Sequence, residues 1–254
     1  MMLLAFDIGN TNITLGCFDG DTLRFVSRMF SAAEKASDEI AVSLLNILHI
    51  HQTRPEDIDG AIISSVVPVL TQTVAQAVTT LTGKLPRIVG PEHHGCFKVD
   101  ILPIEQIGAD LISASVAAVK KYPLPCLIAD LGTATKILVI DESGRFCGCT
   151  IAPGVKISAD ALNKRTALLP AVNFTVPKHA IGTNTTECIQ SGIVFGTAAM
   201  LDGMVQRILK ELHVPRATLV ATGGYSKSIL PCCEQTFTYD ENLLLDGLRA
   251  IYES

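Results

Sequence analysis

The sequence predicts an α/β protein made of two similar lobes with a cleft between them. Apolar, strand-like runs alternate along the chain with segments whose apolar residues recur at helical spacing, which is typical of a mixed, largely parallel sheet with helices on its faces. The second observation is a repeat of one layout, an apolar strand, Asp-x-Gly and a second strand, in MLLAFDIGNTNITLGCF from residue 2 and PCLIADLGTATKILVID from residue 125. Aligning Asp7 with Asp130 also aligns Gly9 with Gly132, which indicates an internal duplication. Chance is the alternative, because Asp-x-Gly after a strand is a common turn.

Each copy of the repeat is predicted to be a hairpin with a polar bend. The elements expected after the first copy are a helix at 36–51, a strand at 60–68 ended by proline, a helix at 71–82 and a strand at 86–89. In the second half the pattern predicts a long helix at 188–212 and a strand at 217–224 that ends in paired glycines.

Composition excludes several classes of protein. The 254 residues are 48% hydrophobic, which is enough for one large core or two modest ones. The net charge of −5, without a basic run, argues against a nucleic-acid partner. The sequence shows no apolar stretch long enough to cross a membrane and no signal-peptide pattern, so we expect a cytoplasmic protein without a membrane partner. The eight cysteines lack the spacing of a zinc site and are expected to be reduced thiols.

The first bend, Asp7-Ile8-Gly9-Asn10-Thr11-Asn12, combines a carboxylate at the end of a strand with backbone, amide and hydroxyl donors. Such a bend can cradle phosphate oxygens while Asp7 contacts a hydrated Mg²⁺. Neither GxxxxGK[ST] nor GxGxxG occurs in the chain. An ordinary polar turn is the alternative.

The second bend, Asp130 to Lys136, offers two hydroxyl groups and a carboxylate. Facing the first bend, it would add Thr133 to the phosphate contacts and Asp130 to a cation. Gly223 and Gly224 would let a flat ring or a ribose lie against the backbone. A simple turn is again the alternative for the glycine pair.

Asp110, in the stretch QIGADLI, opens a predicted helix. A carboxylate there can favour the positive end of a helix, or it can act as the general base for a substrate hydroxyl. The residues alone do not separate these two roles.

Taken together, the motifs DIGNTNITLG, IGADL, ADLGTATK, GCTIAPG, IGTNTTECIQSGIVFG and ATGG closely resemble, in this order, those of the type III pantothenate kinase family. The resemblance covers essentially the full chain. That family belongs to the superfamily of acetate and sugar kinases, heat-shock chaperones and actin. The resemblance therefore implies the actin-like ATPase fold, two duplicated ribonuclease-H-like lobes at 1–118 and 119–254 with a nucleotide cleft between them.

The resemblance also implies an activity and its cofactors. Members phosphorylate pantothenate on its primary hydroxyl, giving 4'-phosphopantothenate in the first step of coenzyme A biosynthesis. They use ATP as co-substrate, Mg²⁺ and a monovalent cation, K⁺ or NH₄⁺, and they are typically homodimers.

Site residues follow by motif. Asp110 would be the catalytic base, Asp7 would lie near Mg²⁺, and Asp130 would bind the monovalent cation. The residues expected to contact the nucleotide are Asp7, Ile8, Gly9, Asn10, Thr11, Asn12, Ile13, Thr14, Thr133, Gly223 and Gly224. Those expected to contact pantothenate are Gly108, Ala109, Asp110, Leu111 and Thr185, the last from a dimer interface.

Leu111 departs from the family pattern, in which Arg follows the catalytic Asp. Losing the charge-assisted hydrogen bond of an arginine costs roughly 1.5 to 3 kcal/mol, unless Lys98, Lys120 or Lys121 compensates. A non-catalytic nucleotide-binding regulator and a kinase for another small hydroxylated substrate are therefore alternative functions. Ile101 also stands near a position where many members carry tyrosine, and Cys147 replaces a glycine.

Overall fold

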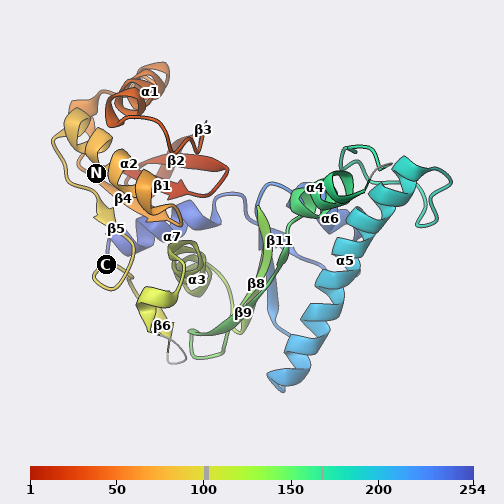
Figure 1. Ribbon diagram of the computed structural model, residues 1–254. Helices are drawn as coiled ribbons and strands as arrows, with labels where there is room; N and C mark the ends of the chain where they lie inside the picture. Colours follow the sequence, from red (N-terminus) through yellow and green to blue (C-terminus); the bar gives the residue numbers. More distant parts are fainter. Residues whose placement is uncertain (100–102, 167–168) are drawn as a thin grey trace. The chain divides into compact units, whose positions relative to one another are not determined.

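The computed structural model of the chain describes residues 1–99, 103–166 and 169–254, so Ile101 lies outside the described residues. The chain forms two compact units (Figure 1). The first unit comprises Met1–Lys120 together with Asn242–Ser254, and the second comprises Lys121–Glu241.

The sheet of the first unit has the strand order β3-β2-β1-β4-β5. Its first three strands form an antiparallel meander, and β4 and β5 continue the sheet in parallel on the other side of β1. The strands of the meander are β1 (Met2–Ile8), β2 (Asn12–Asp19) and β3 (Thr22–Phe30), and the parallel strands are β4 (Gly60–Ser65) and β5 (Arg87–Ile88). The other elements of this unit are α1 (Ser37–Ile50), α2 (Pro68–Thr82), β6 (Lys98–Val99), α3 (Ala109–Lys121) and α7 (Leu243–Tyr252).

The second unit repeats this topology. Its strands β7, β8 and β9 form the antiparallel meander, while β10 and β11 run parallel to β7 on its other side. The bounds are β7 (Cys126–Leu131), β8 (Ala134–Ile140), β9 (Arg145–Pro153), β10 (Thr218–Thr222) and β11 (Thr238–Tyr239), with helices α4 (Val155–Arg165), α5 (Thr185–Glu211) and α6 (Ser226–Ile229). The matching strand order confirms the predicted duplication and the α/β fold class.

Each unit has its own apolar core. In the first, side chains of β1 such as Leu4, Phe6 and Ile8 pack with those of α1 and α2. In the second, side chains of β7 such as Leu127 and Leu131 pack with those of α5. The central strands are therefore buried apolar runs, as expected of strands covered by helices.

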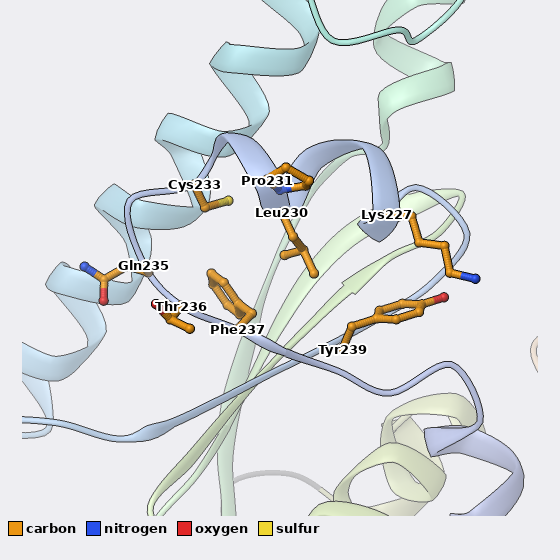
Figure 2. Close-up of a pocket in the computed structure, with 8 residues that line it drawn as sticks. All are labelled: Lys227, Leu230, Pro231, Cys233, Gln235, Thr236, Phe237 and Tyr239. Atoms are coloured by element: carbon orange, nitrogen blue, oxygen red, sulfur yellow. The ribbon is translucent and has the colours of Figure 1, made fainter.

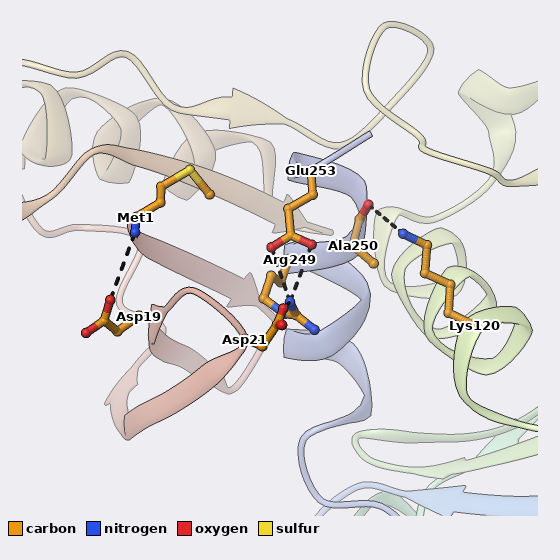
Figure 3. Close-up of polar contacts among 7 residues, drawn as sticks. All are labelled: Met1, Asp19, Asp21, Lys120, Arg249, Ala250 and Glu253. Carbon is orange, nitrogen blue, oxygen red and sulfur yellow. Dashed lines mark hydrogen bonds and ion pairs between the residues drawn. The ribbon is translucent and has the colours of Figure 1, made fainter.

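The C-terminal helix α7 groups with the first unit, whereas the sequence led us to expect a second lobe that continued from 119 to 254. Packing explains the difference. A Cβ added to Gly247 would lie 1.9 Å from the Ser113 carbonyl oxygen of α3, so only glycine permits this approach of the two helices. Arg249 forms ion pairs with Asp21 and Glu253, and Lys120 Nζ lies 3.4 Å from the Ala250 carbonyl oxygen (Figure 3).

Two element boundaries differ from the pattern for local reasons. The strand expected to run to residue 68 ends at Ser65, because Pro68 begins helix α2, where its missing N–H is not needed. The long helix expected from residue 188 begins at Thr185, because the Asn184 side chain accepts a hydrogen bond from the Glu187 amide at 3.0 Å and caps it.

Among the described residues, there is one helix, α5, whose length and apolar composition would be sufficient to cross a membrane. This corrects the expectation that no such stretch exists. The inward residues of α5, including Val194, Ala198 and Leu201, form the core of the second unit. Packing in that core therefore accounts for the composition of the helix.

The eight cysteines carry free thiols. Burial raises the pKa of Cys17 to about 11 and that of Cys126 to about 12, so both thiols stay protonated at neutral pH. These two are small core residues, as we expected of all eight. The expectation was wrong for the exposed Cys96, Cys149 and Cys188.

Candidate functional site

The bend between β1 and β2 is a compact turn with exposed donors. The Gly9 amide donates to the Asn12 carbonyl at 3.0 Å, which closes the turn. Ser31, just after β3, fixes it from the side, because its hydroxyl donates to the Gly9 carbonyl at 2.5 Å and its amide donates to the Thr11 carbonyl at 3.0 Å. Asn10, Thr11 and Asn12 are exposed. Ser31 is a supporting residue that sequence reasoning missed, because no motif includes it.

Ile8 and Ile13 flank this bend, and both were expected to contact the nucleotide. Their side chains are only 0% and 3% exposed and belong to the apolar core of the first unit. Any contact of theirs with a ligand must therefore use backbone atoms. Thr14 is half-buried and pairs with Asp7 across the hairpin.

Asp7 lies next to the carboxyl end of β1, in register with Ser64 of the parallel strand β4. Residues in register on neighbouring strands project to the same face of a sheet. The Ser64 hydroxyl is buried and has no hydrogen-bond partner among the described residues. A buried, unsatisfied oxygen beside a carboxylate fits a hydrated Mg²⁺, which keeps waters that can donate to it.

The second bend is shorter, since Gly132 and Thr133 alone connect β7 to β8. The Gly132 amide donates to the Ala134 carbonyl at 3.1 Å. A Cβ added to Gly154 would lie 2.1 Å from the Thr133 carbonyl oxygen, so the backbone before α4 rests directly against the bend. Gly154 stands in the motif GCTIAPG, but its contact with the bend depends on a chain crossing that no local pattern reveals.

Asp130 does not have the surroundings expected of a monovalent-cation ligand. Its carboxylate lies 2.8 Å from Lys136 Nζ, and both side chains are only 15% exposed. Lys136 faces Asp130 because the two residues are paired across the β7–β8 hairpin. An ammonium group has no acceptor for a metal ion, so the residues here do not fit a K⁺ bound to Asp130.

The paired glycines after β10 have different surroundings. Gly223 adopts φ +93°, and a Cβ added to it would lie 2.6 Å from the backbone of Leu131, so its role is close packing against β7. A Cβ on Gly224 would meet nothing within 4 Å. Only Gly224 therefore leaves open space for a ligand.

A hollow of about 440 Å³ lies in the segment that follows these glycines. Figure 2 shows Leu230, Phe237 and Tyr239 around it, with Lys227 at its rim. Lys227 Nζ lies 5.3 Å from the Tyr239 ring centre and 3.1 Å from a carboxylate oxygen of Glu241. Aromatic and apolar walls with a cation at the rim suit a flat ring that carries a polar edge. Sequence reasoning missed these residues because they form no motif.

Asp110 is the second residue of α3, and its carboxylate is held at the amino end of that helix. Its Oδ1 accepts a hydrogen bond from the Leu111 amide at 2.9 Å. A Cβ added to Gly108 would lie 2.5 Å from the same Oδ1, so the glycine makes room for the carboxylate to fold back. Ala109 is buried, whereas Asp110 and Leu111 are half-buried. This geometry suits both a helix-end charge and a positioned base.

The lysines considered as substitutes for the family arginine lie elsewhere or have other partners. Lys120 and Lys121 stand at the far end of α3, about 15 Å along the helix from Asp110. Lys121 lies 2.5 Å from Asp240, and Lys120 contacts the Ala250 carbonyl. Lys98 lies in β6. Lys120 and Lys121 therefore do not supply the missing charge beside Leu111.

Thr185 is the first residue of α5 and is exposed. The turn before it is rigid, because the Thr183 amide and hydroxyl donate to Glu187 at 2.9 and 2.8 Å. These hydrogen bonds hold the pKa of Glu187 below its usual value. Thr185 is thus presented from a fixed, capped helix end.

Within each unit, the structure gathers residues expected to contact the nucleotide at one edge of the sheet, whereas Asp110 stands in α3 and Thr185 at the start of α5. In the first unit, Asp7 and the Gly9 bend lie at the carboxyl end of β1. In the second, Asp130 is in register with Thr222, which brings Gly223 beside the Thr133 bend. Ligands bind outside the carboxyl ends of strands in open α/β sheets, so this edge is where a ligand of each unit is expected.

Comparison with known proteins identifies the family of the chain. A family model for type III pantothenate kinase matches residues 3–207. Type III pantothenate kinases from Moorella thermoacetica and from Exiguobacterium sp. are each 38% identical over 252 residues, covering 99% of this chain and 99% and 98% of the relatives. A solved structure, the activator of 2-hydroxyisocaproyl-CoA dehydratase from Clostridium difficile with bound ADPNP, has a TM-score of 0.56 at 12% identity and covers 99% of this chain and 94% of that chain. That likeness shows a shared fold. The chain therefore belongs to the type III pantothenate kinase family.

Proposed function

We propose that this protein transfers the terminal phosphoryl group of ATP to the primary hydroxyl of pantothenate, which gives 4'-phosphopantothenate in the first step of coenzyme A biosynthesis. The observation that carries this proposal is the identity of 38% with type III pantothenate kinases over almost the whole chain. The duplicated bends are consistent with it, because phosphoryl transfer asks a protein chiefly for positioning and electrostatic stabilisation.

In this proposal, the bend of each unit binds phosphate. In the first unit, the exposed donors of Asn10, Thr11 and Asn12 contact phosphate oxygens, and in the second unit the exposed Thr133 has the equivalent role. Backbone amides and hydroxyls thus replace the lysine-bearing loop of other nucleotide-binding folds. Ser31 and Gly154 keep the two bends in shape.

Asp7, with the Ser64 hydroxyl beside it, would hold a hydrated Mg²⁺. The bound ion would neutralise charge on the phosphates during transfer. The Asp7 carboxylate would hold the hydrated ion, and the Ser64 hydroxyl, which has no hydrogen-bond partner among the described residues, would accept a hydrogen bond there.

Asp110 takes the proton from the pantothenate hydroxyl as that oxygen attacks phosphorus. The Leu111 amide holds Oδ1, which fixes the plane of the carboxylate. Because the carboxylate is held in one orientation, less entropy is lost when the base and the substrate hydroxyl reach their reactive arrangement. Gly108, Ala109 and Leu111 line the same turn, and Leu111 offers an apolar contact where the family arginine offers charge.

The nucleotide base occupies the hollow lined by Phe237 and Tyr239, and Gly224 lies against the ribose. The size and apolar walls of the hollow support this placement. Lys227 at the rim donates to a polar edge of the ring.

We also propose a homodimer in the cytoplasm, in which Thr185 of one subunit reaches the pantothenate of the other. Large apolar side chains are exposed on the second unit, and a partner copy would cover them. They are Ile151, Ile157, Leu162, Val176 and Ile181.

The test is direct detection of phosphopantothenate by mass spectrometry after incubation of the purified protein with ATP, Mg²⁺ and pantothenate. We expect product from the natural protein and a loss of about 10² to 10⁴ in turnover for Asp110→Asn, because a general base contributes that much. Glu105→Gln is the matched control, since it removes an exposed carboxylate just before the same helix. Thermal unfolding checks that both variants fold.

Two outcomes contradict the proposal. If ATP binds but no phosphopantothenate forms, the result favours the alternative suggested by Leu111, a non-catalytic nucleotide-binding regulator. If ATP is consumed only with another hydroxylated acceptor, the change at Leu111 has changed the substrate. An active Asp110→Asn variant would reduce Asp110 to a helix-end charge.

A further inference from the structure

We propose that the ammonium group of Lys136 is the resident cation of the Asp130 carboxylate, so that this kinase needs no K⁺ or NH₄⁺ at that position. The proposal deepens the proposed function and rests on it for its activity assay. It concerns a charge that the chain carries itself, instead of one taken from the solution.

The contact has the geometry of a built ion pair. Lys136 Nζ lies 2.8 Å from Asp130 Oδ2, within the range of a charge-assisted hydrogen bond. Both side chains are only 15% exposed, so solvent and salt screen this pair much less than a surface pair.

Backbone pairing fixes the two residues opposite each other. Asp130 and Lys136 are cross-strand partners in the β7–β8 hairpin, and such partners project to the same face of the sheet. The two-residue bend sets this register. The lysine is therefore held at the carboxylate by the hairpin itself.

The second carboxylate oxygen lies beside the bend. A Cβ added to Gly132 would lie 3.4 Å from Asp130 Oδ1, which is ordinary contact distance. On the neighbouring strand, Thr222 is in register with Asp130 and is 1% exposed. A metal ion at Asp130 would need to displace Lys136 or lie beside a like charge, which is unfavourable in a partly buried site.

A tethered cation has a functional consequence. The positive charge stands beside the Thr133 bend in every molecule, whatever the potassium concentration of the medium. A phosphate at that bend would meet a preorganised charge, which stabilises developing negative charge without waiting for an ion to bind.

The experiment measures kcat/KM for ATP at constant ionic strength, with KCl or NH₄Cl replaced stepwise by tetramethylammonium chloride. We expect the natural protein to change by less than about twofold. Lys136→Met keeps the length of the side chain and removes its charge, so it should lose about tenfold or more in tetramethylammonium and recover in K⁺. Lys156→Met, which removes an exposed lysine of α4 in the same unit, should behave as the natural protein.

Thermal unfolding in the same salts provides a readout without turnover. We expect equal midpoints in K⁺ and tetramethylammonium for the natural protein, and a higher midpoint in K⁺ for Lys136→Met, because an ion that binds the folded state stabilises it. Lys136→Gln should show the same shift, and it replaces Lys136→Met if that variant does not fold.

Two results overturn the proposal. One is a natural protein whose activity or unfolding midpoint depends on K⁺, and the other is a folded Lys136 variant that K⁺ neither stabilises nor activates. If the natural protein forms no phosphopantothenate in any salt, the proposed function fails, and the unfolding midpoints alone decide the role of Lys136.

Discussion

The first and second bends descend from one pattern, yet they differ at the residue opposite their shared aspartate. In the β1–β2 hairpin, Asp7 pairs with Thr14, seven residues on. In the β7–β8 hairpin, Asp130 pairs with Lys136, six residues on, because that bend is one residue shorter. Because the second bend is one residue shorter, the register of its hairpin shifts by one residue. Successive side chains of a strand point to opposite faces of the sheet, so a different side chain then faces the carboxylate.

This difference shows how the two copies of a duplicated motif can take different electrostatic roles. Asp7 has an unsatisfied hydroxyl beside it in Ser64, which suits an external hydrated ion. Asp130 has an ammonium group at 2.8 Å, which already supplies the positive charge. Under our two proposals, the same Asp-x-Gly sequence would therefore serve two electrostatic roles, and the residue facing it on the neighbouring strand would decide which.

Of the changes at the two bends, the largest expected effect comes from removing the charge at the first. Asp7→Asn keeps the shape of the side chain but weakens the hold on Mg²⁺, so we expect kcat/KM for ATP to fall by about 10² to 10³, the loss typical of one preorganised electrostatic contact. The measurement is steady-state kinetics over a range of Mg²⁺ concentrations. Excess Mg²⁺ should restore part of the activity.

The counterpart, Asp130→Asn, should act mainly on stability. It leaves Lys136 without its charged partner, and losing a hydrogen bond between charged groups costs about 1.5 to 3 kcal/mol in the free energy of unfolding. Denaturant titration of Asp130→Asn and of the natural protein measures this loss. An unchanged free energy of unfolding would show that the contact with Lys136 does not stabilise the second bend.

The sequence carried enough information to predict this duplication but not its asymmetry. Asp7, Gly9, Asp130 and Gly132 stand in local patterns of apolar runs and turn residues, and these patterns predict hairpins directly. The pairing of Asp130 with Lys136 depends on the length of the bend between them. A change of one residue in that length barely alters the composition of the segment, so the sequence pattern does not reveal it.

Long-range packing was the part that could not be predicted. The close approach of Gly247 to Ser113 places the C-terminal helix in the first unit, and it joins segments far apart in the chain. Ser31 and Gly154 likewise support the bends from segments outside them. Tertiary contacts of this kind depend on where the chain crosses itself, which no short window of sequence records.

A smaller effect is expected from crowding the second bend. The backbone angles of Gly154, φ −69° and ψ 165°, suit any residue, but the Cβ of Gly154→Ala would lie 2.1 Å from the Thr133 carbonyl oxygen. Relief of that overlap requires a backbone shift, which costs about 1 to 3 kcal/mol in the free energy of unfolding. Denaturant titration measures the loss.

The matching change at the first bend serves as the control for stability. A Cβ on Gly9 would meet the Asn12 carbonyl oxygen at 3.4 Å, which is ordinary contact. Gly9→Ala should therefore cost much less than Gly154→Ala. A Gly154→Ala protein as stable as the natural one would mean that the second bend yields easily and is not held by the chain before α4.

The smallest expected effect concerns the support of the first bend from β3. Ser31→Ala removes the hydroxyl that donates to the Gly9 carbonyl at 2.5 Å, and one such hydrogen bond contributes about 0.5 to 1.5 kcal/mol. Because the donors of the bend then lose part of their fixed geometry, KM for ATP should rise by up to about tenfold, the ratio that 1.4 kcal/mol represents. Ser43→Ala is the matched control, since it also loses a hydroxyl-to-carbonyl hydrogen bond, at 2.8 Å and within α1, outside the first bend. A rise in KM for ATP in Ser31→Ala but not in Ser43→Ala, at similar unfolding midpoints, would show that Ser31 acts through the bend. Equal KM values would show that the turn closed by Gly9 and Asn12 holds its shape without the Ser31 hydroxyl.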